Sequence, residues 1–156
     1  MLLFKRFFAR IFAFVVINKI KRSYSNAPEI QRKTLKKLVE KAKNTSFGID
    51  HNFYDIKNYE DFIDRVPVRD YEQIKKYIER IKKGEHDVLW PGKPKYLAKT
   101  SGTTSGVKQI PITNESMPNH ILSARNALLF YIYETQKTTF LNGKTIFIQG
   151  SPVLKN

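Results

Sequence analysis

A stretch rich in glycine and hydroxyl side chains in the C-terminal half has the residue types that bind phosphate. Gly102 and Gly106 allow the backbone to turn sharply and to approach a ligand closely. Successive backbone N–H groups in such a turn can bind an anion, while hydroxyls add donors and Lys108 adds a positive charge. The candidate phosphate-binding residues are Thr100, Ser101, Gly102, Thr103, Thr104, Ser105, Gly106 and Lys108. On these residues alone, a solvated polar turn is the competing interpretation.

The spacing of this loop differs from that of a P-loop. A P-loop has the pattern G-x-x-x-x-G-K-[ST] between a strand and a helix. Here Lys108 stands two residues beyond the second glycine, and a strand is expected to follow it. The pattern therefore favours a loop between two antiparallel strands and disfavours a P-loop kinase or GTPase.

The strands that would hold this loop are predicted from the residues on either side of it. Tyr96–Lys99 and Val107–Thr113 are the two predicted strands, and Pro111 places the second near a sheet edge or a bulge. A further buried strand is predicted at Thr145–Gln149 after an Asn-Gly turn. Residues 95–156 are therefore expected to begin a sheet that they do not complete.

A long helix is predicted after the second strand, over residues 115–136, with Asn114 as its cap. Its apolar residues recur at helical spacing, and this stripe is expected to face the core. The predicted stripe consists of Ile121, Ala124, Leu128, Tyr131 and Ile132.

Residues 28–86, ahead of the loop, are expected to be mainly helical. Apolar periodicity and helix-end signals predict three helices, Pro28–Lys43, Tyr59–Arg65 and Tyr71–Lys83. Asn58 is the expected cap of the second helix, and Asp70 with Gln73 forms a capping box for the third. Asn44–Tyr54 is predicted to be a loop.

The first 25 residues are predicted to form a basic amphipathic helix. Residues 1–22 contain six Lys or Arg residues and no acid. An apolar stripe at helical spacing consists of Phe4, Phe7, Phe8, Ile11, Phe12 and Val15. The uncharged run Ile11–Asn18 is much shorter than the ~20 residues of a membrane span. Docking of the stripe onto the protein's own domain is preferred; a helix on an anionic membrane and a weak targeting peptide stay open.

The composition is that of a folded protein in a reducing compartment. The 156 residues are 41% hydrophobic, which is enough to form a core. The chain has no cysteine, which excludes disulfides and thiolate chemistry, so a cytoplasmic location is expected. The net charge is +14, but its lysines are spread over the chain and no nucleic-acid-binding signature accompanies them. A solvated basic surface is therefore favoured over nucleic-acid binding.

The segment Thr100–Lys108 resembles the phosphate-binding signature of adenylate-forming enzymes, [ST]-[SG]-G-T-[ST]-[GST]-x-x-K in outline. Its flanks narrow the resemblance to the GH3 (acyl-acid amido synthetase) family. The segments similar to that family are Thr45–Gly48, Asp61–Glu72, Tyr77–Glu85, Leu89–Gly92 and Ile110–Thr113. The likeness runs from about residue 30 to the end of the chain.

This resemblance implies an α/β fold, in which a helical N-terminal part leads into the start of a mixed sheet of an adenylate-forming large domain, incomplete within residues 1–156. It implies an ATP- and Mg²⁺-dependent ligase that activates a carboxylic acid as an acyl-adenylate and transfers it to an amine, such as an amino acid. The loop would hold the β- and γ-phosphates, with Lys108 as the catalytic residue that neutralises the leaving pyrophosphate. Family members are several times longer, with further nucleotide-binding motifs downstream, so the isolated chain is expected to be inactive.

Two other functions stay open. An acyl-CoA ligase would share the loop and differ in the second half-reaction, although the flanks favour GH3. A basic module could instead bind an anionic membrane or nucleic acid through residues 1–22, with a steep dependence on salt. No metal site is expected from His51, His86 and His120, because they lack metal-ligand spacing.

Overall fold

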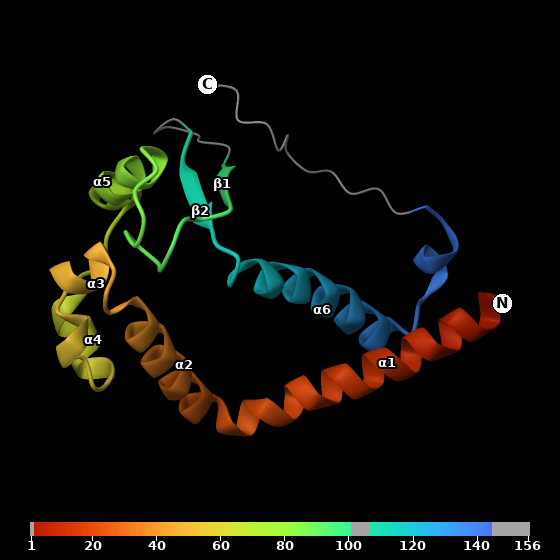
Figure 1. Cartoon of the computed structure of the whole chain (residues 1–156). Helices are drawn as coiled ribbons and strands as arrows, with labels where there is room; N and C mark the ends of the chain where they lie inside the picture. Colours follow the sequence, from red (N-terminus) through yellow and green to blue (C-terminus); the bar gives the residue numbers. More distant parts are fainter. Residues whose placement is uncertain (1, 101–106, 145–156) are drawn as a thin grey trace. The chain divides into compact units, whose positions relative to one another are not determined.

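The computed structural model describes residues 2–100 and 107–144 (Figure 1). The described residues form mainly helices, together with one two-stranded antiparallel sheet. The chain divides into two compact units. The terminal unit contains residues 1–22 and 122–156, and the central unit contains residues 23–121.

The terminal unit is built on two helices, α1 (Leu2–Ser23) and α6 (Met117–Thr135), followed by the short helix η3 (Thr139–Asn142). Figure 1 shows α6 approaching α1 toward the C-terminal end of α6. Their shared core consists of Ala13, Ile17, Leu129 and Ile132, with Ala9, Val16, Ile20, Phe130 and Tyr133 partly buried around it. Lys21 donates a hydrogen bond to Glu134 over 3.2 Å, which raises the pKa of Lys21 above its ordinary value.

The face through which α1 packs differs from the predicted one. The predicted stripe is exposed, with Phe4, Phe7 and Phe8 each at least 60% accessible. The helix packs instead through Ala9, Ala13 and Ile17. Small side chains let two helices approach closely, whereas a row of phenylalanines would hold them apart. Docking within the chain is therefore confirmed for α1, but the face predicted to dock was wrong.

The predicted stripe of α6 was also partly wrong. Leu129 and Ile132 are buried, while Ile121, Leu128 and Tyr131 are exposed. The helix begins at Met117, after a turn over residues 114–116. Thr113 and Ser116 close this turn reciprocally through two 3.0 Å hydrogen bonds between side chain and backbone. Asn114 is thus not the cap. Among the described residues, no helix has both the length and the apolar character needed to cross a membrane.

The described residues of the central unit form four α-helices, two short 3₁₀ helices and the hairpin, ahead of the start of α6. Their bounds are η1 Tyr24–Asn26, α2 Ala27–Ala42, α3 Ser46–Asp50, η2 Phe53–Asp55, α4 Tyr59–Arg65, α5 Tyr71–Lys82, β1 Tyr96–Lys99 and β2 Gln109–Ile112. Two buried clusters hold them together, one around Val39, Ala42 and Phe53 and the other around Tyr77, Ile81 and Val88. Phe47 packs against both clusters.

Most local predictions for this unit are confirmed. Helix α4 has the predicted bounds, Asn58 caps it, and Asp70 with Gln73 forms the predicted capping box of α5. Strand β1 is also as predicted, while β2 begins at Gln109 rather than Val107. The predicted strand Thr145–Gln149 lies outside the described residues. The described part therefore confirms the helical portion and one hairpin, and the larger mixed sheet stays a prediction.

The prediction of a loop over Asn44–Tyr54 was wrong, since this segment contains α3 and the start of η2. The Oγ1 of Thr45 accepts a hydrogen bond from the Gly48 N–H at 3.0 Å and donates one to the Ala42 carbonyl at 2.7 Å. These bonds start a new helical turn directly after α2 ends. The segment is too short to display helical periodicity, which is why the pattern missed it.

Candidate phosphate-binding site

The candidate loop connects the two strands of the hairpin. Strands β1 and β2 pair antiparallel, with Tyr96 opposite Ile112 and Lys99 opposite Gln109. The pairing continues into the loop, because the Thr100 N–H donates to the Lys108 carbonyl at 3.0 Å. The predicted antiparallel connection is thereby confirmed. Of the predicted site residues, the structure describes Thr100 and Lys108, while residues 101–106 lie outside the described part.

Helix α5 positions the hairpin through both apolar and polar contacts. Leu97 of β1 packs against the buried cluster that includes Tyr77 and Ile81 of α5. The hydroxyl oxygen of Tyr71, the first residue of α5, accepts a hydrogen bond from the Gln109 N–H at 2.9 Å. The residue that follows Lys108 is thus tied to the start of α5.

Tyr71 also lies beside Lys108 itself. The Lys108 Nζ lies 5.7 Å from the centroid of the Tyr71 ring, within cation–π range. The Asp70–Gln73 capping box fixes the turn that carries Tyr71, through two reciprocal bonds of 2.9 Å. Lys108 takes part in no ion pair with any residue that the structure describes. Its charge is therefore available to an anion at the end of the loop.

Tyr71 was not among the predicted site residues. The capping box beside it was visible in the sequence, but it signals a helix start and says nothing about a contact 38 residues away. A positioning role for Tyr71 could be recognised only once α5 and the hairpin were placed together.

Replacing Tyr71 by phenylalanine should weaken the attachment of Gln109, at the C-terminal end of the loop, to α5. The ring next to Lys108 would remain, while the Gln109 N–H would lose its acceptor, at a cost of about 1 kcal/mol. We expect faster amide hydrogen exchange at Gln109, with the exchange at Gln73 unchanged because its capping bond to Asp70 does not involve Tyr71. Equal exchange at Gln109 in both proteins would contradict this role.

Thr45–Gly48, one of the segments that resemble GH3 proteins, contacts the residues just ahead of another, Leu89–Gly92. The backbone N–H groups of Ser46 and Phe47 donate to the carbonyls of Asp87 and Val88 at 2.8 and 2.9 Å. The turn that follows is closed by the Asp87 side chain, which accepts from the Gly92 N–H at 2.7 Å. These contacts join Thr45–Gly48 to the segment leading into Leu89–Gly92, so both have a scaffolding role in the central unit.

Buried polar groups of the central unit serve packing. The Tyr77 hydroxyl donates to Asp50 at 2.6 Å, and burial, followed by this bond, raises the pKa of Tyr77 above its ordinary value. His51 is 5% exposed, stacks on Phe47 and has its Nδ1 2.6 Å from the Phe47 carbonyl oxygen. Among the described residues, no group of three or more His, Asp or Glu side chains could hold a metal ion.

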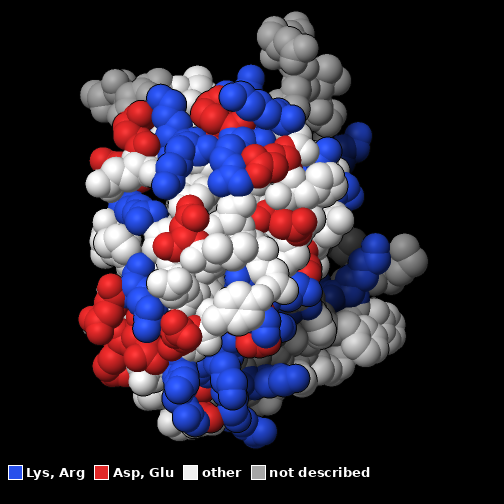
Figure 2. Space-filling model, turned by 60° about the vertical axis from the view of Figure 1, so that its left-hand side comes forward, with Lys and Arg blue, Asp and Glu red and all other residues white. Residues whose placement is uncertain are grey.

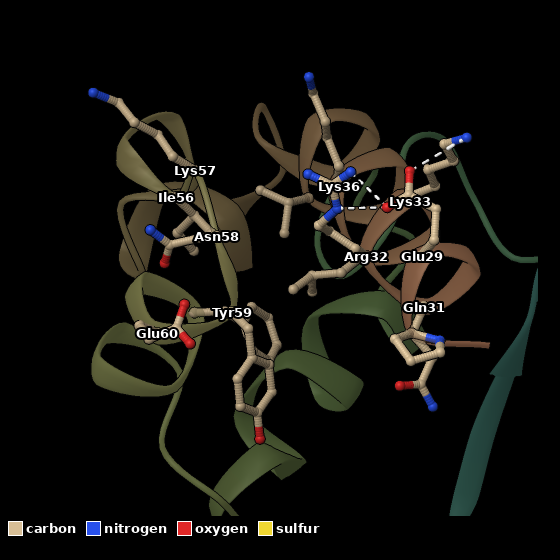
Figure 3. A pocket seen from close by; sticks show the side chains of 14 residues that line it. Glu29, Gln31, Arg32, Lys33, Lys36, Ile56, Lys57, Asn58, Tyr59 and Glu60 are labelled. Carbon is tan, nitrogen blue, oxygen red and sulfur yellow. Dashed lines mark hydrogen bonds and ion pairs between the residues drawn. The ribbon is translucent and has the colours of Figure 1, made fainter. Parts of the chain in front are cut away.

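An open pocket of about 950 Å³ lies in the central unit, between α2 and the segment that leads into α4 (Figure 3). Arg32 and Lys33 on its α2 side both contact Glu29, and the hydrogen bond from Arg32 lowers the pKa of Glu29. Lys36 and Lys57 also line it. None of the described site residues lines this pocket.

Positively and negatively charged side chains share the face of the molecule drawn in Figure 2. Figure 2 shows Lys and Arg side chains interleaved with Asp and Glu on one face. Several such pairs lie at helical spacing, including Arg32 with Glu29, Lys75 with Glu72 and Lys82 with Glu79. Pairs of this kind contribute only a few tenths of a kcal/mol each and are typical of a solvated surface.

Comparisons with known proteins agree with the family resemblance. The family model described as GH3 family N-terminal domain matches residues 16–150. An indole-3-acetic acid-amido synthetase, GH3.15 of Arabidopsis thaliana, is 29% identical over 152 residues, covering 85% of this chain and 25% of the relative. Jasmonoyl–L-amino acid synthetase JAR4 of Nicotiana attenuata is 26% identical over 143 residues, covering 90% of this chain and 24% of the relative. The chain thus spans about a quarter of the length of these relatives. Because the family match extends over most of its residues, the chain belongs to the GH3 family.

Proposed function

We propose that this chain is the N-terminal part of an ATP-dependent ligase that joins a carboxylic acid to an amine, such as an amino acid. The observation that carries the proposal is the loop Thr100–Lys108, which has the composition of a phosphate-binding turn and connects two paired strands in a GH3 chain. The names of the relatives, which are amido and amino acid synthetases, favour amide formation over thioester formation.

The proposed reaction has two steps. The substrate carboxylate attacks the α-phosphorus of ATP, forming an acyl-adenylate and releasing pyrophosphate. The amine then attacks the acyl carbonyl, loses a proton and displaces AMP, leaving an amide. Mg²⁺ would supply charge neutralisation at the phosphates when bound. The contribution of this chain is to hold the β- and γ-phosphates with its loop amides and hydroxyls, and to set Lys108 against the pyrophosphate as its charge increases.

The described ends of the loop fit this role. The bond between Thr100 and Lys108 closes the loop at its base. The Tyr71 hydroxyl fixes the residue after Lys108, and the Tyr71 ring lies beside the Lys108 ammonium group. A half-buried lysine held in this way loses less conformational entropy when it binds a phosphate than a freely moving one.

The test is the affinity of the chain for MgATP, measured by the change in ³¹P chemical shifts during titration. We expect Lys108→Ala to weaken binding about tenfold, because a charge-assisted contact to phosphate is lost. Lys95 offers a matched control, since its Nζ lies 5.5 Å from the centroid of the Tyr96 ring but outside the loop. Lys95→Ala should change the affinity less than about twofold.

Equal losses in the Lys108→Ala and Lys95→Ala variants would contradict the role of the loop, as would wild-type affinity in Lys108→Ala. A second measurement addresses the chemistry. We expect the chain by itself to give no ATP–pyrophosphate exchange with carboxylic acids, because acyl-adenylate formation requires many groups to be positioned together.

A further inference from the structure

Helix α1 has two apolar faces, and α6 covers only one of them. Its inner face, centred on Ala13 and Ile17, is fully buried. Phe4 precedes Ala13 by nine residues and Phe8 precedes Ile17 by nine, which is about two and a half helical turns. Phe4 and Phe8 therefore lie on the side of α1 opposite to α6.

The outer face of α1 is a continuous apolar stripe. It consists of Phe4, Phe7, Phe8, Ile11 and Val15. Their exposed fractions are 69, 60, 62, 44 and 59%, so five large apolar side chains meet solvent side by side. Single exposed apolar residues are common on proteins, but a stripe of this kind indicates a binding surface.

Positive charges border the outer face on both sides. At 100° per residue, Lys5 and Lys19 fall along one border, and Arg10 and Lys21 fall along the other. All four are exposed. Arg10 and Lys21 bridge toward the end of α6, where they contact the Gln136 carbonyl and Glu134. The helix contains no acidic residue.

The outer face precedes the part of the chain that the GH3 family model matches. That match begins at residue 16, whereas the stripe ends at Val15. Among the inner-face residues, Val16, Ile17 and Ile20 lie within the match, whereas all five residues of the outer face lie ahead of it.

We propose that the outer face of α1 binds the surface of a membrane containing anionic lipids. Phenylalanines on one face with lysines and arginines at its borders match the pattern of a helix that lies in the plane of a bilayer interface. The aromatic rings would enter the boundary between headgroups and acyl chains, while the long Lys and Arg stems keep their charges among lipid phosphates. No described helix is suited to span a bilayer, which agrees with binding at the surface.

The test is co-sedimentation of the full 156-residue chain with vesicles of phosphatidylcholine and phosphatidylglycerol at 3:1, compared with pure phosphatidylcholine. We expect binding to the anionic vesicles that weakens as NaCl is raised. Phe4→Ser/Phe8→Ser should reduce the partition coefficient about tenfold or more. Lys5→Gln/Lys19→Gln should also reduce it, by about 25-fold, at roughly fivefold for each charge.

Matched controls come from the central unit. Tyr54 and Tyr59 are 63 and 62% exposed, close to the values for Phe4 and Phe8. Tyr54→Ser/Tyr59→Ser and Lys37→Gln/Lys83→Gln should leave partitioning unchanged within about twofold. Because the chain has no cysteine, Phe8→Cys can carry a single environment-sensitive fluorophore. Its emission should shift to the blue on binding, and that of a label at Tyr54→Cys should not.

Four outcomes would overturn the proposal. The first is equal binding to neutral and anionic vesicles, and the second is undiminished binding by Phe4→Ser/Phe8→Ser. The third is a label at residue 8 whose emission does not respond to vesicles. The fourth is a dimer in sedimentation velocity that Phe4→Ser/Phe8→Ser dissociates without any effect on lipid binding. The last result would assign the outer face to a second copy of the chain. Phe4 and Lys5 lie outside the segment Thr100–Lys108. MgATP affinity should therefore be the same in all these variants, which keeps this test separate from the proposed function.

Discussion

Replacing Gly48 by alanine is expected to destabilise the central unit by about 3 kcal/mol. A Cβ at this position would overlap the carbonyl oxygen of Ala42 and lie 2.9 Å from that of Lys43. Both oxygens belong to the backbone where α2 ends, and the Ala42 carbonyl already accepts hydrogen bonds from the N–H and the Oγ1 of Thr45. Neither atom can move without breaking the junction between α2 and α3.

Other glycines of the chain provide a graded control for this prediction. A Cβ on Gly143 would meet nothing within 4 Å, and its φ of −103° suits any residue, so Gly143→Ala should be neutral. Gly92 also has open space but a φ of +76°, so Gly92→Ala should cost about 1 kcal/mol through backbone strain. Urea unfolding of the three variants measures the order. A Gly48→Ala protein as stable as Gly143→Ala would show that the junction does not pack as described.

Replacing Ile17 by alanine is expected to destabilise the terminal unit by about 3 kcal/mol. Ile17 is fully buried between α1 and α6, where it packs with Leu129 and Ile132. Removing its three outer carbons leaves a cavity that two helices cannot easily close. Amide hydrogen exchange in the middle of α6 would measure the loss, because those amides are protected only while α1 is docked.

The matched variant for Ile17→Ala is Ile11→Ala, on the same helix and with the same chemical change. Ile11 is 44% exposed on the outer face, so its truncation should cost less than about 1 kcal/mol. This comparison decides which face of α1 is docked. The apolar pattern of the sequence alone predicts that the face with Ile11 is docked. A larger loss of stability in Ile11→Ala than in Ile17→Ala would show that this face, and not the one with Ile17, packs on α6.

Signals confined to a few residues predicted their elements well. The capping box of Asp70 and Gln73 and the cap at Asn58 depend on side chains three residues from their partners. The bounds of α4 and of β1 could therefore be predicted from the sequence. The same locality explains the Asn114 error, because Thr113 and Ser116 close a reciprocal turn around that residue.

Choices that depend on a distant partner could not be predicted from the pattern. Helix α1 offers an aromatic stripe and a small-residue stripe, and only the shape of α6 selects the second. For the candidate site, the glycine and hydroxyl pattern indicated the loop and Lys108, and the antiparallel connection is confirmed. The contribution of Tyr71 depends on the docking of α5 against the hairpin, which no local pattern encodes.

The distance along the chain between α1 and its packing partner has a consequence for biosynthesis. Ile17 packs against Leu129, so it is translated more than a hundred residues before the helix that buries it. At about 5 to 20 residues per second, that interval lasts roughly 5 to 20 s. During this time both apolar faces of α1 are uncovered outside the ribosome. The nascent chain is therefore most prone to aggregation, and most in need of a chaperone or of a lipid surface, until α6 has been made and has docked on α1.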